Sequence, residues 1–152
     1  MNDMKKILLF AMMLVAGVMA FTGCKKDKDK VDSPLVGTWS VWEQEDMYYE
    51  ITFNGDGSYT YINDYYFYDQ ETGKKIPTPH EHIVIKGSYT INGDIATVHN
   101  ESQTLSMDGG PAEPSEGWQP TDEKMKFKVE GKTLHLTRDY GTEYPWDMTL
   151  TK

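Results

Sequence analysis

Cysteine is nearly absent from this chain of 152 residues, which has a single thiol at Cys24. A length in this range suits one domain. One cysteine cannot form a disulfide within the chain, so we expect the folded part to be stabilised by its core alone.

Long apolar runs are also scarce, and the one that stands out is ILLFAMMLVAGVMAF, residues 7–21. Its 15 residues are fewer than the ~20 that a membrane-spanning helix needs. The run follows a short basic start, MNDMKK, and precedes the small or neutral residues Thr22 and Gly23. This pattern predicts a signal peptide over residues 1–23.

The residues that end in the cysteine, FTGC, resemble a bacterial lipobox. In a lipobox a signal peptidase cuts just before the cysteine, and the sulfur carries diacylglycerol. The resemblance implies that Cys24 is lipidated, and each buried CH₂ of the acyl chains contributes ~0.8 kcal/mol to membrane anchoring. The position after the cysteine holds Lys25 instead of the aspartate often associated with retention in the inner membrane. We therefore expect an outer-membrane lipoprotein that faces the periplasm or the cell surface.

Residues 24–33, CKKDKDKVDS, are too polar to form a core, and we expect a flexible tether. Basic residues are few beyond it: from Ser33 to Lys152 there are 20 acidic and 9 basic side chains, a net charge of −11. Such a surface repels phosphate backbones, which argues against a nucleic-acid partner.

Helical periodicity is missing as well, and the dominant pattern has period two. In KMKFKVEGKTLHLTRD, apolar Met125, Phe127 and Val129 alternate with lysines, and then Leu134 and Leu136 alternate with polar residues. The EG pair between the two runs is a turn signal. The stretch therefore predicts a hairpin with one buried face.

The same design recurs in YYEITFNGDGSYTYI, in HIVIKGSYTINGDIATV and in PWDMTLTK. Adding LVGTWSVWEQ and SQTLSM gives about eight to ten strands. The sequence predicts an all-β domain over residues 34–152, an antiparallel meander closed into a barrel, with a β-sandwich as the alternative. Two long connections, residues 69–81 and 108–122, are interpreted as binding rims or lids, with disorder as the alternative.

The segment LVGTW, together with GDGSYTY, GSYTINGD and TLHLTRDYG, resembles the lipocalin-like domains of secreted bacterial lipoproteins. The resemblance covers residues 34–152. It implies a barrel in which Gly37 eases the tight start of the first strand and Trp39 plugs the closed end. The chain lacks the disulfides of lipocalins and ends on a strand pattern where they have a helix. The resemblance therefore implies the barrel shape for this chain but not the class of ligand that lipocalins bind.

Arginine occurs once, at Arg138. In lipocalins an arginine near the last strand lies over the Gly-x-Trp indole, so the resemblance implies a cation–π contact of Arg138 with Trp39, worth ~0.5–2 kcal/mol. A surface charge paired with Asp139 or Glu143 is the alternative.

Aromatic residues are plentiful: the chain has ten tyrosines, four tryptophans and five phenylalanines. Tyrosine gives a cavity wall an apolar body and a hydroxyl, which suits amphipathic ligands, but it also favours strands and fills cores. If the barrel is hollow, alternation predicts which side chains line it, and the loop with Trp118 becomes a lid. The candidate ligand-binding residues are Tyr49, Ile51, Phe53, Tyr59, Tyr61, Phe127, Leu136 and Trp118.

Motifs for catalysis are missing. The sequence has no Gly-x-Ser-x-Gly elbow, and its acidic pairs have nothing to split their pKa values, so we expect no enzyme and no catalytic residue. In PHEH, His80 and His82 have a spacing that suits a metal, but a tight site needs a third or fourth ligand and loop histidines are the preferred interpretation. We expect no metal and no cofactor.

Three functions stay open at this point. The first is a membrane-anchored lipocalin-like lipoprotein, a monomer, that holds a small apolar or amphipathic ligand in its barrel. The second is an interaction protein with a solid core, whose acidic, tyrosine-rich rim docks another envelope component. The third is a carbohydrate-binding module with an open aromatic face. A hollow or a filled interior discriminates between the first and the second.

Overall fold

The computed structural model describes residues 30–152, and Val31–Lys152 form one compact unit. The predicted signal peptide, Cys24 and most of the tether lie outside the described residues. No helix long and apolar enough to cross a membrane occurs in the part of the chain that the structure describes. The strands are β1 (Gly37–Trp42), β2 (Met47–Phe53), β3 (Ser58–Tyr65), β4 (Glu81–Asn92), β5 (Ile95–Met107), β6 (Glu113–Pro114), β7 (Thr121–Glu130), β8 (Thr133–Arg138) and β9 (Trp146–Thr151).

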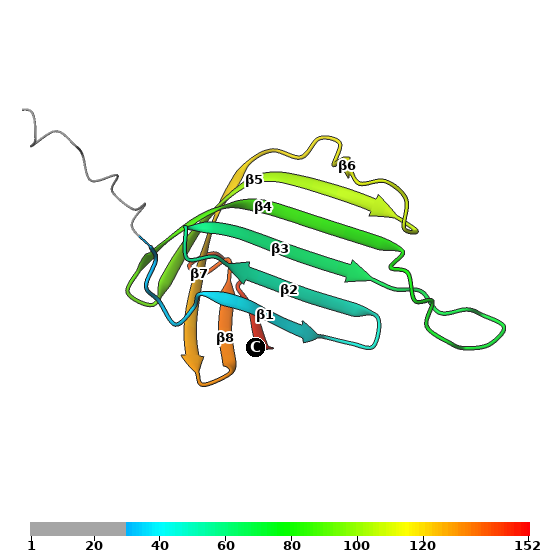
Figure 1. The fold of residues 1–152 in the computed structure, drawn as a ribbon, viewed down its shortest axis with the longest axis horizontal. Helices are drawn as coiled ribbons and strands as arrows, with labels where there is room; N and C mark the ends of the chain where they lie inside the picture. The colour runs from blue at the N-terminus through cyan, green and yellow to red at the C-terminus, as the bar shows by residue number, and fades with distance from the viewer. Residues whose placement is uncertain (1–29) are drawn as a thin grey trace, which may run out of the picture. The chain divides into compact units, whose positions relative to one another are not determined.

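The strands form an antiparallel meander that closes on itself (Figure 1). Each long strand pairs with its neighbours in the chain, and β9 returns to β1 through the pair Ser40 and Thr151. Eight strands close the barrel, while the two-residue β6 only extends the edge of β5. The predicted all-β antiparallel barrel is confirmed, and the sandwich alternative is excluded.

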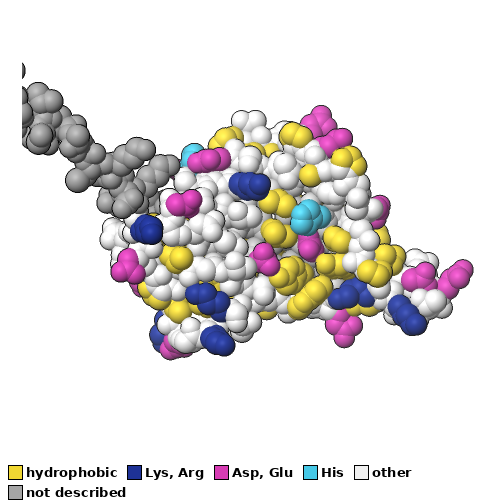
Figure 2. Space-filling model, viewed as in Figure 1, with side chains coloured by type: hydrophobic (Ala, Val, Ile, Leu, Met, Phe, Trp, Pro, Cys, Tyr) yellow, Lys and Arg dark blue, Asp and Glu magenta, His cyan; other side chains and the backbone are white. Residues whose placement is uncertain are grey.

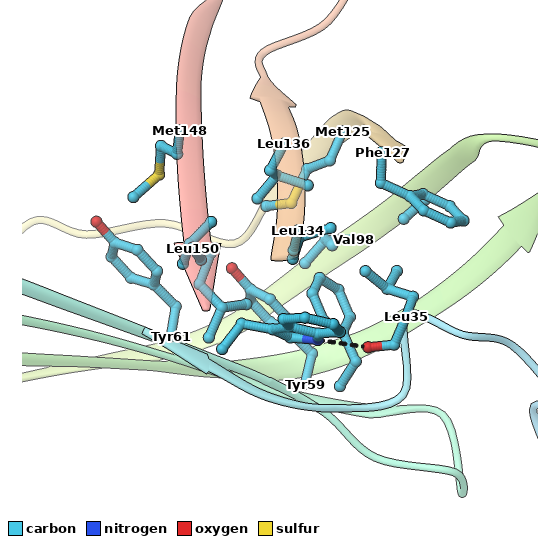
Figure 3. Close-up of a cluster of buried hydrophobic side chains, with 14 of the residues drawn as sticks. Leu35, Tyr59, Tyr61, Val98, Met125, Phe127, Leu134, Leu136, Met148 and Leu150 are labelled. Atoms are coloured by element: carbon cyan, nitrogen blue, oxygen red, sulfur yellow. Dashed lines mark hydrogen bonds between the residues drawn. The ribbon is translucent and has the colours of Figure 1, made fainter. Parts of the chain in front are cut away.

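Most of the residues that the strands turn inward are apolar, and they form the core of the closed barrel. The β7–β8 hairpin pairs Phe127 with Leu136 and Val129 with Leu134, as the period-two pattern predicts. Figure 3 shows how the buried side chains converge from different strands. The core consists of Leu35, Trp39, Tyr49, Ile51, Phe53, Tyr59, Tyr61, Tyr89, Ala96, Val98, Met125, Phe127, Leu134, Leu136, Met148 and Leu150.

The folded unit begins slightly earlier than predicted. Val31 packs against the core, and its backbone N–H donates to the carbonyl oxygen of Gly55 at 2.7 Å. The tether was expected to contribute nothing to the core up to residue 33. The core contact of Val31 shortens that segment.

The pairing of β4 with β5 contains a bulge. Lys86 pairs with Ser102 and Gly87 with Asn100, so Glu101 has no opposite residue on β4. The extra residue shifts the alternation of β5, which explains how one strand of 13 residues replaces the two short segments read from the sequence.

Gly87 is required for the close approach of the two strands at this bulge. A Cβ atom at position 87 would lie 1.9 Å from the backbone oxygen of His99. We expect Gly87→Ala to lower the free energy of unfolding by about 1–3 kcal/mol, because the strands must separate. Gly55→Ala is the matched control, since its Cβ would meet only Val36 at 4.0 Å. Urea denaturation measures both, and equal stabilities would contradict the proposed role of Gly87.

Candidate functional site

Trp39 of β1 is part of the buried core, and the role of its indole as the plug of the barrel end stays a prediction. Its side chain is fully buried, and its Nε1–H donates to the backbone oxygen of Leu35 at 2.7 Å, the dashed line in Figure 3. The cation over the indole is Lys152, whose Nζ lies 4.6 Å from the ring centroid and donates to the Val36 oxygen at 2.8 Å. Gly37, with φ of 139°, leaves room for it: a Cβ there would lie 2.3 Å from Lys152 Cε.

The predicted contact of Arg138 with Trp39 is therefore wrong. The Arg138 guanidinium lies over Tyr61, at 4.4 Å from the ring centroid, and donates through Nε and Nη2 to the two carboxylate oxygens of Glu123, at 2.8 Å each. The surface alternative is wrong too, because the side chains of Arg138 and Glu123 are only 13% and 7% exposed. Burial alone would lower the pKa of Arg138, but the hydrogen bonds and charge of Glu123 outweigh it and raise that pKa.

The seven candidate residues predicted to line the interior do point inward, and they are packed. Their exposed fractions lie between 0% and 9%. The rings of Phe53 and Tyr59 have centroids 5.4 Å apart, and those of Tyr49 and Tyr61 are 6.3 Å apart. Side chains with so little open surface pack on one another rather than around a hollow. Burial also raises the pKa of Tyr49 to about 12, so its phenol is neutral. That these residues bind a ligand stays a prediction.

The eighth candidate, Trp118, lies in the connection between β6 and β7. Its indole is half-buried, and its backbone N–H donates to Ser115 at 3.3 Å. The segment before it is tied to the barrel by the short pairing of β6 with β5. This connection has an ordered turn next to the edge of the barrel, and a lid function for it stays a prediction.

A second cluster of aromatic side chains lies on the outer surface. Trp42 is 48% exposed, because the core-facing residues of β1 are Trp39 and Val41 and the next position points outward. The Trp42 ring lies 5.1 Å from that of Tyr48 and 5.4 Å from that of Tyr66. Figure 2 shows hydrophobic side chains gathered on the side of the molecule where the connection between β3 and β4 projects.

Beside this cluster is an open pocket of about 640 Å³. We call it the outer aromatic pocket, and it is lined by Trp42, Gln44, Glu45, Tyr68 and Lys75. The sequence indicated a tyrosine-rich rim without naming its members. It did not single out Trp42, although its place next to the inward-facing, half-buried Val41 was the available signal.

Another pocket, of about 400 Å³, opens on the outer face of β7, β8 and β9. Lys126, Thr137 and Asp147 line it and alternate with the core residues of their strands. Its charged groups pair with one another, as Lys126 does with Asp94 at 3.6 Å. This arrangement is typical of a solvated surface.

The histidines have separate carboxylate partners. His80 Nδ1 is 2.8 Å from Asp108 Oδ1, and His82 Nδ1 is hydrogen-bonded to Asp64 Oδ1. In residues 30–152, no three histidine, cysteine or acidic side chains come together in a way that could hold a metal ion.

His99 is hydrogen-bonded to Asp122 on β7 through Nδ1, and that bond raises the pKa of the imidazole above its ordinary value of 6.5. Since the pKa is raised in the folded state, the stabilisation is complete below the unfolded pKa and is lost as pH rises through the folded pKa. NMR titration should show the raised pKa, and Asp122→Asn should bring it back toward 6.5. Glu101→Gln removes a carboxylate with a weaker effect, so it should lower the pKa of His99 by less than Asp122→Asn does. A larger decrease with Glu101→Gln would contradict the assignment of Asp122 as the main cause of the raised pKa.

Comparison with known proteins adds no relative. No family model matches this chain, and neither a curated protein nor a solved structure shows significant similarity to it. The shape, an eight-stranded antiparallel closed barrel, is compatible with the lipocalin-like fold.

Proposed function

We propose that this chain is a lipid-anchored binding protein, without enzymatic activity, that uses a filled lipocalin-like barrel as a scaffold and binds its ligand at the outer aromatic pocket. The observation that carries the proposal is the contrast between the two aromatic clusters. The interior tyrosines are packed against the core, whereas Trp42 is half-exposed beside an open pocket of about 640 Å³. A pocket this open can hold part of a small molecule against the Trp42 ring.

The proposal shares the solid core of the second function considered above, replaces its protein partner with a small ligand, and abandons the interior carrier. A carrier needs a hollow of several hundred cubic ångströms, and the side chains predicted to line it have almost no open surface. An outer pocket leaves the core intact while ligands come and go. Export, attachment through Cys24 to the outer membrane and a monomeric state complete the proposal, and the acidic surface keeps the domain away from anionic head groups.

The anchor is tested by replacing Cys24 with alanine. The variant is expected to appear in the soluble fraction with an unchanged melting temperature, because the core begins only at Val31. Membrane fractionation and thermal denaturation measure the two properties. A Cys24→Ala protein that stays with the membrane would overturn the lipoprotein assignment.

The location of binding is tested by fluorine NMR, because the four tryptophans report on four regions. Trp39 marks the buried core, Trp42 the outer aromatic pocket, Trp118 the long connection and Trp146 the inner face near Arg138. Protein labelled with 5-fluorotryptophan is titrated with a panel of fatty acids, sugars and amines, and tryptophan-to-phenylalanine variants assign the signals. Compounds that bind should move the Trp42 signal first. Compounds that move Trp39 and Trp146 but not Trp42 would support the interior carrier instead.

A further inference from the structure

The outer aromatic pocket already contains an ammonium group, which belongs to the protein itself. Lys75 Nζ lies 3.8 Å from the centroid of the Trp42 ring and 5.2 Å from that of Tyr66. It also donates to the backbone oxygen of Glu45 at 3.2 Å. Two ring faces and a carbonyl oxygen are the partners that a primary ammonium prefers outside water.

Lys75 reaches the pocket from a small loop with its own internal structure. In the connection between β3 and β4, Tyr68 and Lys75 form an isolated bridge, and the Asp69 carboxylate accepts from the backbone N–H groups of Glu71 and Thr72. Tyr68 contacts the opposite wall through its hydroxyl, which donates to the Glu45 carboxylate at 3.2 Å. Figure 1 shows this connection projecting beyond the end of β3. None of the residues 68–75 of this loop belongs to the barrel core.

The charge around the pocket is negative. Glu45 lines it, Glu43 and Asp46 belong to the same β1–β2 connection, and Tyr48 donates to Glu50 on β2. The residues from Ser33 onward carry a net charge of −11. This field raises the local concentration of cations and repels anions.

We infer that the outer aromatic pocket binds a soluble primary alkylammonium compound, such as a diamine, in the place that Lys75 occupies, and that Lys75 acts as an internal competitor. The inference rests on the proposed function, since it names the ligand class of the same pocket. A lipid ethanolamine head group is disfavoured, because its phosphate would lie among the carboxylates of the β1–β2 connection. Binding of a neutral sugar would not explain why the rings of Trp42 and Tyr66 both lie close to an ammonium group.

The test is calorimetric titration of the full-length lipidated protein, in neutral detergent at low salt, with pentane-1,5-diamine. A tethered group competes at an effective concentration in the millimolar range, so its removal should increase affinity. We expect Lys75→Ala to lower the Kd by about tenfold or more relative to the wild type. Lys74→Ala is the matched control, because the neighbouring lysine is exposed and has no ring contact, and it should bind as the wild type does.

Two further measurements separate an ammonium site from non-specific attraction. In the Lys75→Ala background, Trp42→Leu should abolish binding, and pentan-1-ol, which has the same chain without the charge, should not compete. The melting temperature of each variant verifies folding, and Tyr66→Leu replaces Trp42→Leu should the latter unfold. Equal Kd values for wild type and Lys75→Ala, or binding that survives the loss of the ring, would overturn the inference. Those results leave the proposed function standing, because other compounds can still move the Trp42 fluorine signal.

Discussion

Replacing Trp39 with alanine is expected to lower the free energy of unfolding by ~3–5 kcal/mol. The indole is fully buried in the core, and it makes a hydrogen bond with Leu35 and a cation–π contact with Lys152. Its removal opens a cavity among core residues that belong to several strands and cannot collapse together. Chemical denaturation of the Trp39→Ala variant measures the effect.

Two controls separate the parts of this effect. Trp118→Ala should change stability little, because that indole is half-buried in a connection and packs on no core residue named above. Trp39→Phe keeps an aromatic ring but leaves the Leu35 carbonyl without its donor, so it should cost less than alanine. Equal effects of alanine at positions 39 and 118 would contradict the assignment of Trp39 to the barrel floor.

Glu123→Gln is expected to destabilise the fold by ~3–5 kcal/mol, because it leaves the Arg138 guanidinium charged, buried and without its counter-ion. Arg138→Lys keeps the charge but loses the two parallel hydrogen bonds and the planar contact with Tyr61. It should therefore also destabilise, by a smaller amount. Urea denaturation at neutral pH measures both variants.

The decisive comparison is the double variant Glu123→Leu, Arg138→Met. Removing both charges removes the desolvation penalty together with the attraction, so the double variant should be more stable than Glu123→Gln alone. The exposed pair of Lys128 and Glu130 is the matched surface control, and Lys128→Ala should leave stability nearly unchanged. A Glu123→Gln variant as stable as the wild type would show that the ion pair has no structural role.

Local alternation predicts much of this fold. Phe127 and Leu136 are buried and paired because alternate positions from Met125 to Val129 of β7 and at Leu134 and Leu136 of β8 are apolar, and that information lies within each strand. The bulge at Glu101 was not predicted, because it depends on the backbone of His99 approaching Gly87 from a strand read as two separate segments. Alternation shows which face of the sheet a side chain occupies, but it does not show the register between neighbouring strands.

The site residues divide in the same way. Trp39 is buried in the first strand, where the short Gly-x-Trp motif places it, while its role as a plug stays a prediction. Arg138 was misplaced because its partner, Glu123, is 15 residues away and no local pattern links the two positions. Lys75 was missed entirely, since only the folded connection brings it over Trp42, 33 residues earlier in the chain. Contacts set by loops carry little sequence signal.

The central claim, that the barrel is a filled scaffold and not a carrier, is tested most directly by fatty-acid binding to the lipid-free Cys24→Ala protein. A fluorescent fatty acid is titrated against this protein and against its Tyr61→Asp variant. The account predicts no saturable binding at concentrations up to about 100 μM, because apolar ligands need an enclosed hollow of several hundred cubic ångströms. Saturable binding at micromolar concentration that is lost in Tyr61→Asp, with tryptophan fluorescence quenched in the parent protein, would contradict it.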